Sequence, residues 1–242
     1  MISIVTPVLN CSTFIEQTIK SIQKLTCDYE HIIVDGGSTD GTLEVINKYG
    51  HIKLLHQNGS QGMYQAIDQG ICASAGSIVS WVNADDIIIA EKYDELVQKM
   101  EQKRADLAYS DALYHFIYGH RYEFVPAVPF GMYFLRRGIM PFVQPSSIFT
   151  KELYERLGGL DFRKFKIIGD RDFFQRAADI GNLQIAYLPA ITTVFMRRDD
   201  TLYYANKERV SVERSLTRRT EDSLFNRLLL HFFRFVRRVL RG

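Results

Sequence analysis

Short, β-branched apolar stretches alternate with longer stretches of helical period over the first hundred residues. Strands are expected at Ile2–Thr6, His31–Asp35, Ile52–His56 and Ser77–Val82. Helices are expected between and after them, at Thr13–Leu25, Thr42–Tyr49, Gly62–Ser74 and Glu91–Lys103. Strands that alternate with helices through short connections are typical of a parallel sheet with crossover helices. The pattern therefore predicts a Rossmann-like α/β fold with a mostly parallel central sheet flanked by helices.

The alternation becomes less regular after residue 105. Further strands are expected at Asp106–His115, Arg121–Val125, Ser147–Phe149 and Gln184–Phe195, and further helices at Phe130–Arg137, Lys151–Leu157 and Asp172–Ile180. No internal repeat and no Gly/Ser-rich linker divides this part of the chain. We therefore expect one main domain over residues 1–200, in two halves at 1–104 and 105–200, followed by a basic helical tail over 201–242.

Polar side chains gather where three of the expected strands end. The segments are Thr6-Pro7, Asp35-Gly36-Gly37-Ser38 and Asn83-Ala84-Asp85-Asp86. In open α/β sheets, ligands bind at the carboxyl ends of the strands. The three segments therefore predict a single ligand-binding crevice.

The run Asp35–Thr42 combines glycines with small polar residues between a strand and a helix. Glycines let a ligand approach the backbone closely, and Asp35 could accept a hydrogen bond from a ribose hydroxyl or a base N–H. A tight strand–helix turn without a ligand would need the same residues. The dinucleotide fingerprint GxGxxG and the phosphate loop GxxxxGK[ST] are both absent.

The segment Asn83–Asp86 follows the most apolar early strand. Carboxylates at a strand end offer hard oxygen ligands to Mn²⁺ or Mg²⁺, and substrate phosphates and water usually complete such a site. A helix N-cap is the alternative use of two adjacent acidic residues at this place.

Composition narrows the class of protein. A chain of 242 residues with 46% hydrophobic and 12% aromatic residues can bury a sizeable core, which excludes a disordered chain. Its three cysteines lie far apart and in no metal-binding spacing, so we expect a reducing compartment and no zinc. We see no signal peptide after Met1 and no apolar run of about 18 residues that could span a membrane.

The last 34 residues differ in charge from the rest. From Arg209 onward there are nine arginines against three acidic residues, or +6, which leaves −4 for residues 1–208. On a helical wheel of residues 224–241, aromatic and aliphatic side chains face away from most of the arginines. This pattern is typical of a helix that lies on an anionic membrane surface. Packing on the body or on a second subunit is the alternative, and nothing indicates nucleic-acid binding.

Several motifs come in a fixed order: Thr6–Asn10, Asp35–Thr42, Gly62–Gly70, Trp81–Asp86, Pro145–Phe149, Leu157–Asp161 and Gly169–Asp172 ahead of Arg176. In this order and spacing the chain resembles the family 2 glycosyltransferases over roughly residues 2–196. It is most similar to the branch that carries DGGSTDGT and LNADD-like motifs.

That resemblance implies a GT-A fold and the inverting transfer of a sugar from a nucleotide-sugar, with a UDP-sugar favoured. Residues 1–104 would bind the donor and 105–200 the acceptor. Asp170 stands where the family has its catalytic base, with Asp172 as its rival, and Arg176 follows on the same helix. Asp85 would bind Mn²⁺ or Mg²⁺, with Asp86 beside it. The residues that would contact the donor are Thr6, Pro7, Val8, Asp35, Gly62, Asn83 and Ala84.

The chain departs from the family pattern at three positions. Asn83 stands for the first acid of the metal motif, as in many members of this branch, whereas Gln65 and Asp68 replace an acidic residue and an asparagine that are usual in the branch. The QxxRW motif of processive synthases is absent, so we expect one sugar to be added at a time. With the tail, these features predict a cytoplasmic enzyme, peripheral on the inner face of the membrane, that acts on a lipid-linked glycan in surface polysaccharide or glycoconjugate biosynthesis. The sequence does not decide whether the protein forms a homo-oligomer. An inactive membrane-associated binding module and a nucleotidyltransferase are the alternatives.

Overall fold

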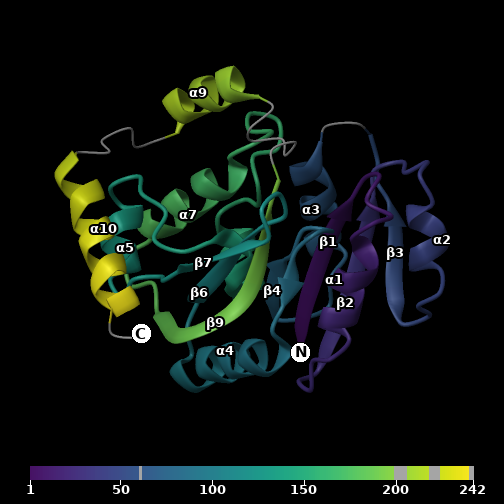
Figure 1. Ribbon diagram of the computed structural model, residues 1–242, viewed down its shortest axis with the longest axis horizontal. Coiled ribbons are helices and arrows are strands. Elements are labelled where there is room, and N and C mark those ends of the chain that lie inside the picture. Colours follow the sequence, from purple (N-terminus) through teal and green to yellow (C-terminus); the bar gives the residue numbers. More distant parts are fainter. Residues whose placement is uncertain (60–61, 199–205, 218–223, 240–242) are drawn as a thin grey trace.

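Nine strands form a single sheet in the computed structural model, which describes residues 1–59, 62–198, 206–217 and 224–239 (Figure 1). The strands are β1 (Ile2–Val8), β2 (Tyr29–Asp35), β3 (Ile52–His56), β4 (Ile78–Trp81), β5 (Ile87–Ile88), β6 (Leu107–Phe116), β7 (Arg121–Val125), β8 (Ser147–Thr150) and β9 (Ile185–Arg197).

Helices connect and cover these strands. They are α1 (Ile15–Ile22), α2 (Thr42–Ile46), α3 (Met63–Cys72), α4 (Ala90–Lys103), α5 (Gly131–Leu135), the 3₁₀ turn η1 (Gln144–Ser146), α6 (Lys151–Arg156), α7 (Gly169–Asp179), α9 (Lys207–Leu216) and α10 (Leu224–Val239). The α/β class is confirmed. Helix α7 begins at Gly169, three residues earlier than predicted, so Asp170 lies in its first turn.

The strand order is β3-β2-β1-β4-β8-β6-β9-β5. Strand β7 lies outside this order and pairs with the second half of β6, as the other strand of a hairpin. The first four strands are parallel, as the alternation of strands and helices predicts. Strand β8 is antiparallel to both of its neighbours, which makes the whole sheet mixed. Val8 of β1 pairs with Asp35 of β2, so these two strands end at the same level of the sheet.

Side chains of the central strands point alternately to the two faces of the sheet, and helices cover both faces. Ile2 and Ile4 of β1 point to the side covered by α1 and α4, whereas Val5 belongs to the core under α3 and α7. Gly70 lets α3 lie close to the sheet, because a Cβ atom there would stand 2.4 Å from a methyl group of Val5.

Aromatic rings fix α7 against the centre of the sheet. Trp81, at the end of β4, stacks on Phe174 and meets Phe173 and Phe149 edge-on, with ring centroids 5.7 to 6.3 Å apart. All four rings are buried. Large aromatic side chains in such contacts contribute strongly to a core, so the start of α7 is held near the carboxyl end of β4.

The C-terminal helix α10 packs along the side of the molecule beside α5 (Figure 1). Leu230 packs against Val128, Phe134 and Ile139. Arg237 forms a two-pronged ion pair with the fully buried Asp111 of β6, with nitrogen–oxygen distances of 2.6 and 3.0 Å. A buried carboxylate requires such a partner, so α10 is tied to the body.

Three of the arginines opposite the apolar side chains bind the body of the protein, in line with the alternative of a tail helix packed on the body. Arg237 pairs with Asp111, Arg238 pairs with Glu123, and Arg234 donates to the carbonyl of Pro126. The outward face of α10 is apolar instead, with exposed side chains at Leu224, Phe225, Leu228, Phe232, Phe235 and Val239. Among the described residues, no helix has both the length and the hydropathy to cross a bilayer.

Replacing Arg237 by alanine should lower the free energy of unfolding by about 3 to 5 kcal/mol, because the charge of Asp111 would stay buried without its cation. Chemical denaturation measures this change. The control is Arg238→Ala, which breaks a partly exposed pair with Glu123 and should cost less than about 1 kcal/mol. Equal losses in the two variants would contradict the role given to the Arg237–Asp111 pair.

Candidate active site

The loops that follow β1 and β2 are joined at the carboxyl edge of the sheet. The amide of Asn10 donates to the hydroxyl of Ser38 at 2.9 Å, and the amide of Thr39 donates to Oδ1 of Asn10 at 2.8 Å. Asn10 adopts a left-handed backbone conformation, with φ of 49°, that turns the chain toward the second loop. The two segments therefore form one continuous wall of the expected crevice.

Asp35 holds the turn that follows it. Its carboxylate accepts hydrogen bonds from the amides of Gly37 at 2.9 Å and Ser38 at 3.2 Å, and only 1% of the residue is exposed. Gly37 has φ of 98°, a conformation that favours glycine. Asp35 thus shapes the glycine turn and presents little surface of its own to a ligand.

The end of β1 is also buried. Thr6 shares a hydrogen bond of 3.0 Å with Nε2 of His31, and burial lowers the pKa of His31 to about 3, so this imidazole is neutral. Pro7 and Val8 are buried as well. Leu9 and Asn10 are the first exposed residues after the strand, and sequence reasoning did not select them because both look like ordinary loop residues.

The two neighbouring acids after β4 have different environments. Asp86 is fully buried and accepts from the amide of Met196 and from the amide group of Asn83, both at 2.9 Å. Burial, together with the adjacent charge of Asp85, raises the pKa of Asp86 well above its ordinary value. Asp86 therefore anchors β9 to this turn, and Asp85 is the acid that reaches the surface.

Asp85 meets a cation that the sequence did not single out. Arg198, directly after β9, places Nη2 3.3 Å from a carboxylate oxygen of Asp85. The two residues are far apart in the sequence, and the β5–β9 pairing and the Asp86–Met196 hydrogen bond bring them together. The hydroxyl of Thr18 fixes the turn itself through the carbonyls of Ala84 and Asp86, at 2.9 and 2.8 Å.

The residues around Asp85 fit a divalent cation that a substrate helps to hold. Within the described parts of the chain, no three His, Cys, Asp or Glu side chains are grouped for a metal. Magnesium-type sites commonly use one or two carboxylates plus substrate phosphates and water. Oδ1 of Asn83, two residues before Asp85, is buried and makes no hydrogen bond within these residues, so this amide oxygen could serve as a second hard ligand.

Asp170 lies in the first turn of α7 and contacts α3. The hydroxyl of Tyr64 lies 3.1 Å from Oδ1 of Asp170 and 3.0 Å from the carbonyl of Ile167. Gly169 makes this approach feasible, because a Cβ atom there would lie 3.0 Å from the Tyr64 ring. Burial raises the pKa of Asp170, against the opposing effect of hydrogen bonds from Arg171 and Tyr64. Such a shift favours proton transfer near neutral pH.

Asp172 and Arg176 form a separate structural unit. Arg176 donates to Asp172 at 2.7 Å and to the carbonyls of Leu157 and Gly159 at 2.6 and 2.8 Å. Asp172 is buried, whereas Asp170 is partly exposed. This unit ties α7 to the loop after α6, and it leaves Asp170 as the more exposed of the two carboxylates.

Glu213 of α9 supports the segment that leads into α7, a role that sequence reasoning missed. Its buried carboxylate accepts from three consecutive amides, those of Lys166, Ile167 and Ile168, at 2.9 to 3.1 Å. Burial opposes the charged form, but these donors and Arg209 lower the pKa of Glu213 overall. The sequence carries no signal for this contact beyond a helical pattern in the tail.

The α/β sheet thus carries two carboxylates near its carboxyl edge, Asp85 after a strand and Asp170 in the first turn of a helix. The chain matches the profile of Glycosyl transferase family 2 over residues 3–158, more than half of its length, and belongs to that family. The resemblance inferred from the ordered motifs is therefore confirmed, and the protein is a glycosyltransferase.

Known proteins agree with this assignment. The chain is 26% identical over 205 residues to the PGL/p-HBAD biosynthesis glycosyltransferase of Mycobacterium bovis, which covers 81% of this chain and 73% of the relative. Residues 1–349 of S. aureus TarS, in complex with UDP-GlcNAc, superpose with a TM-score of 0.66 at 19% identity, covering 91% of this chain and 68% of that TarS chain.

A second solved structure is the mannosyltransferase PcManGT from Pyrobaculum calidifontis, in complex with GDP-Man and Mn²⁺. It superposes with a TM-score of 0.62 at 17% identity and covers 89% of this chain and 61% of that protein. At such identities the likeness shows the shared fold, which confirms the expected GT-A architecture.

Replacing Glu213 by glutamine should destabilise the protein near neutral pH by about 1 to 3 kcal/mol, the range for hydrogen bonds to a charged group. The pKa of Glu213 is lowered, so its stabilising effect is present above the ordinary value of 4.5 and is lost as the pH falls through the folded-state pKa. Thermal denaturation between about pH 7 and about pH 3 should show the difference between wild type and variant shrinking.

Glu208→Gln, on the exposed side of the same helix, is the matched control and should change little. A Glu213→Gln variant that loses nothing near neutral pH, or whose deficit grows on acidification, would contradict this role.

Proposed function

We propose that this glycosyltransferase transfers a single sugar from a nucleotide-sugar, with a UDP-sugar favoured, to an acceptor hydroxyl with inversion at the anomeric carbon. The observation that carries the proposal is the position of Asp170. It lies in the first turn of α7 beside Tyr64 of α3, and α3 follows the carboxyl end of β3. Asp85 follows the carboxyl end of the parallel strand β4, so both acids belong to the same edge of the sheet.

The donor would lie across the ends of β1, β2 and β4. Thr6, Pro7, Val8 and the turn held by Asp35 would form the wall behind the nucleoside. Gly62, Asn83 and Ala84 would contact the remainder of the donor from the start of α3 and the end of β4. Neighbours of the same fold are bound to UDP-GlcNAc and GDP-Man, which supports a nucleotide-sugar as the ligand of this edge.

Asp170 would act as the general base. The acceptor oxygen attacks the anomeric carbon opposite the nucleoside diphosphate, and its bond to carbon forms as the bond from carbon to phosphate oxygen breaks. The proton of the acceptor hydroxyl passes to Asp170, and the electron pair of the broken bond leaves with the diphosphate. Tyr64 holds the carboxylate in place, and the Asp172–Arg176 pair fixes the helix that carries it.

The groups around Asp85 would stabilise the negative charge that develops on the diphosphate. A Mn²⁺ or Mg²⁺ ion held by Asp85, with Asn83 beside it, would supply Lewis-acid stabilisation of the leaving group. Arg198 already lies next to Asp85 and would offer a second cation to the phosphates. Asp86 accepts a hydrogen bond from the amide of Met196 in β9 and would maintain the conformation of the turn after β4.

The acceptor is proposed to be a lipid-linked glycan, which would place the enzyme on the inner face of the membrane in surface polysaccharide or glycoconjugate assembly. The exposed apolar face of α10 supports this location. Self-association through that face would make a homo-oligomer instead. The presence of Asp85 and Asp170 argues against an inactive binding module, and membership of the family argues against a nucleotidyltransferase.

Asp170→Asn should leave binding of the nucleotide-sugar within about twofold of wild type and reduce transfer by about 10² to 10⁴ fold, the range for a lost general base. Calorimetric titration of the donor and a radiolabelled transfer assay measure the two quantities. Asp172→Asn is the comparison, because it breaks the tie to Arg176. This variant should lower the melting temperature, and it should reduce transfer much less than Asp170→Asn does. Wild-type turnover in Asp170→Asn would remove that residue from its role, and donor binding without transfer in the wild type would favour the inactive module.

A further inference from the structure

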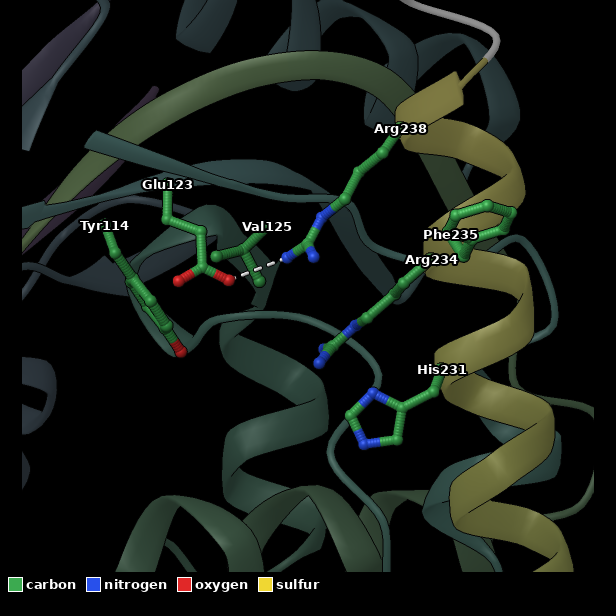
Figure 2. A pocket seen from close by; sticks show the side chains of 7 residues that line it. All are labelled: Tyr114, Glu123, Val125, His231, Arg234, Phe235 and Arg238. Atoms are coloured by element: carbon green, nitrogen blue, oxygen red, sulfur yellow. Dashed lines mark hydrogen bonds and ion pairs between the residues drawn. The ribbon is translucent and has the colours of Figure 1, made fainter. Parts of the chain in front are cut away.

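A cavity of about 340 Å³ lies between α10 and the hairpin of β6 and β7 (Figure 2). Tyr114 and Glu123 line it on the hairpin side, and His231, Arg234 and Arg238 line it from α10. The sugar-transfer chemistry proposed above uses none of these residues.

The charges around the cavity are unbalanced. Arg238 is paired with Glu123 at 2.8 Å (Figure 2). Arg234 donates through Nε to the carbonyl of Pro126 at 3.2 Å, and among the described residues it has no carboxylate partner. Burial, with a smaller contribution from the charge of Arg238, lowers the pKa of Arg234, although Tyr114 and Glu123 act in the opposite direction. An anion in the cavity would offset this cost.

The donors are arranged for a phosphate group. Figure 2 shows Arg234 and Arg238 extending from α10 toward the hairpin, with the ring of His231 beside Arg234. The planar guanidinium of Arg234 carries terminal N–H groups that can bind two phosphate oxygens at once. The edge of the imidazole would offer a further donor from a second direction.

The exposed apolar face of α10 lies next to the cavity. Phe235 lines the cavity and also belongs to that face, where it is 64% exposed. At about 100° per residue, Phe232 and Val239 lie on the same side of the helix as Phe235, and His231 and Arg238 lie on the adjoining side. A phosphate that enters here would therefore have apolar surface beside it, as a lipid headgroup at a bilayer has.

We propose that the cavity binds the headgroup phosphate of an anionic phospholipid while the outward apolar face of α10 enters the membrane interface. The proposal deepens the membrane association proposed above, but it does not depend on the sugar-transfer chemistry. The apolar face meets the bilayer, as the amphipathic pattern of the sequence implies, and Arg234 binds lipid from a pocket, not from an open basic surface.

Co-sedimentation of the full chain with vesicles tests the proposal. Vesicles of phosphatidylcholine alone are compared with vesicles that contain phosphatidylglycerol as well. Arg234→Gln should weaken partition onto the phosphatidylglycerol vesicles by at least about fivefold, the equivalent of one arginine near an anionic surface. Arg156→Gln, an exposed arginine on α6, removes the same charge elsewhere and should have little effect. Phe232→Asn should weaken binding to both kinds of vesicle.

Several outcomes would overturn the proposal. Wild-type partition of Arg234→Gln, or an equal loss in Arg156→Gln, would show that the cavity is not a headgroup site. Stabilisation of the wild type by soluble glycerol 3-phosphate, without vesicle binding, would assign the cavity to a free phosphate. A dimer in solution that Phe232→Asn dissociates, again without vesicle binding, would assign the apolar face to a second copy.

Two measurements keep these results interpretable. His231→Gln alters an exposed residue of the cavity and should also weaken binding to phosphatidylglycerol vesicles, so it replaces Arg234→Gln if that variant does not fold. Nucleotide-sugar binding should be the same in Arg234→Gln and wild type. If neither binds the donor, the proposed enzymatic function fails while the vesicle result still decides the lipid site.

Discussion

The structure depends on how the first turn of α7 is held at the carboxyl edge of the sheet. Trp81 and its neighbouring rings fix the body of the helix, and the hydroxyl of Tyr64 meets Asp170 at its start. Glu213 binds three successive amides just ahead of that turn. These contacts come from β4, α3 and α9, so distant parts of the chain converge on the helix start that carries Asp170. A side chain on a helix held in this way keeps its position, which the proposed role as general base requires.

Much of this arrangement could be predicted from the sequence, because the strands and helices of the first half follow local periodicity. The carboxyl ends of β2 and β4, ahead of Gly36 and Asp85, lie at one edge of the sheet because these strands are parallel to β1, as the alternation predicts. Local pattern could not distinguish Asp85 from Asp86, since the difference arises from β9, which buries only the second acid. The contacts of Arg198 and Glu213 could not be predicted from the sequence, because each residue meets its partner through tertiary packing alone.

The orientation of the C-terminal helix α10 is a second feature that the sequence alone could not predict. A helical wheel predicts an amphipathic helix, and α10 is one. The wheel cannot say which face meets the protein, because that depends on Asp111, a buried acid on β6 that requires Arg237. The cost of an unpaired buried charge exceeds what an arginine gains at a membrane surface. The pairing therefore decides the orientation of α10 and leaves its apolar side chains outward, and the tail is joined to the body that carries the active site.

The most direct test of the central claim is a thermal-shift titration of the wild type with UDP, GDP and dTDP, each with and without Mn²⁺. A ligand that binds only the folded state stabilises it by about 2.7 kcal/mol at a hundredfold excess over Kd. We expect a shift with one nucleotide, UDP being favoured, that depends on the metal and is lost in Asp85→Asn. The absence of a shift with every nucleotide, or an equal shift in Asp85→Asn, would contradict a nucleotide-sugar site at the carboxyl edge of this sheet.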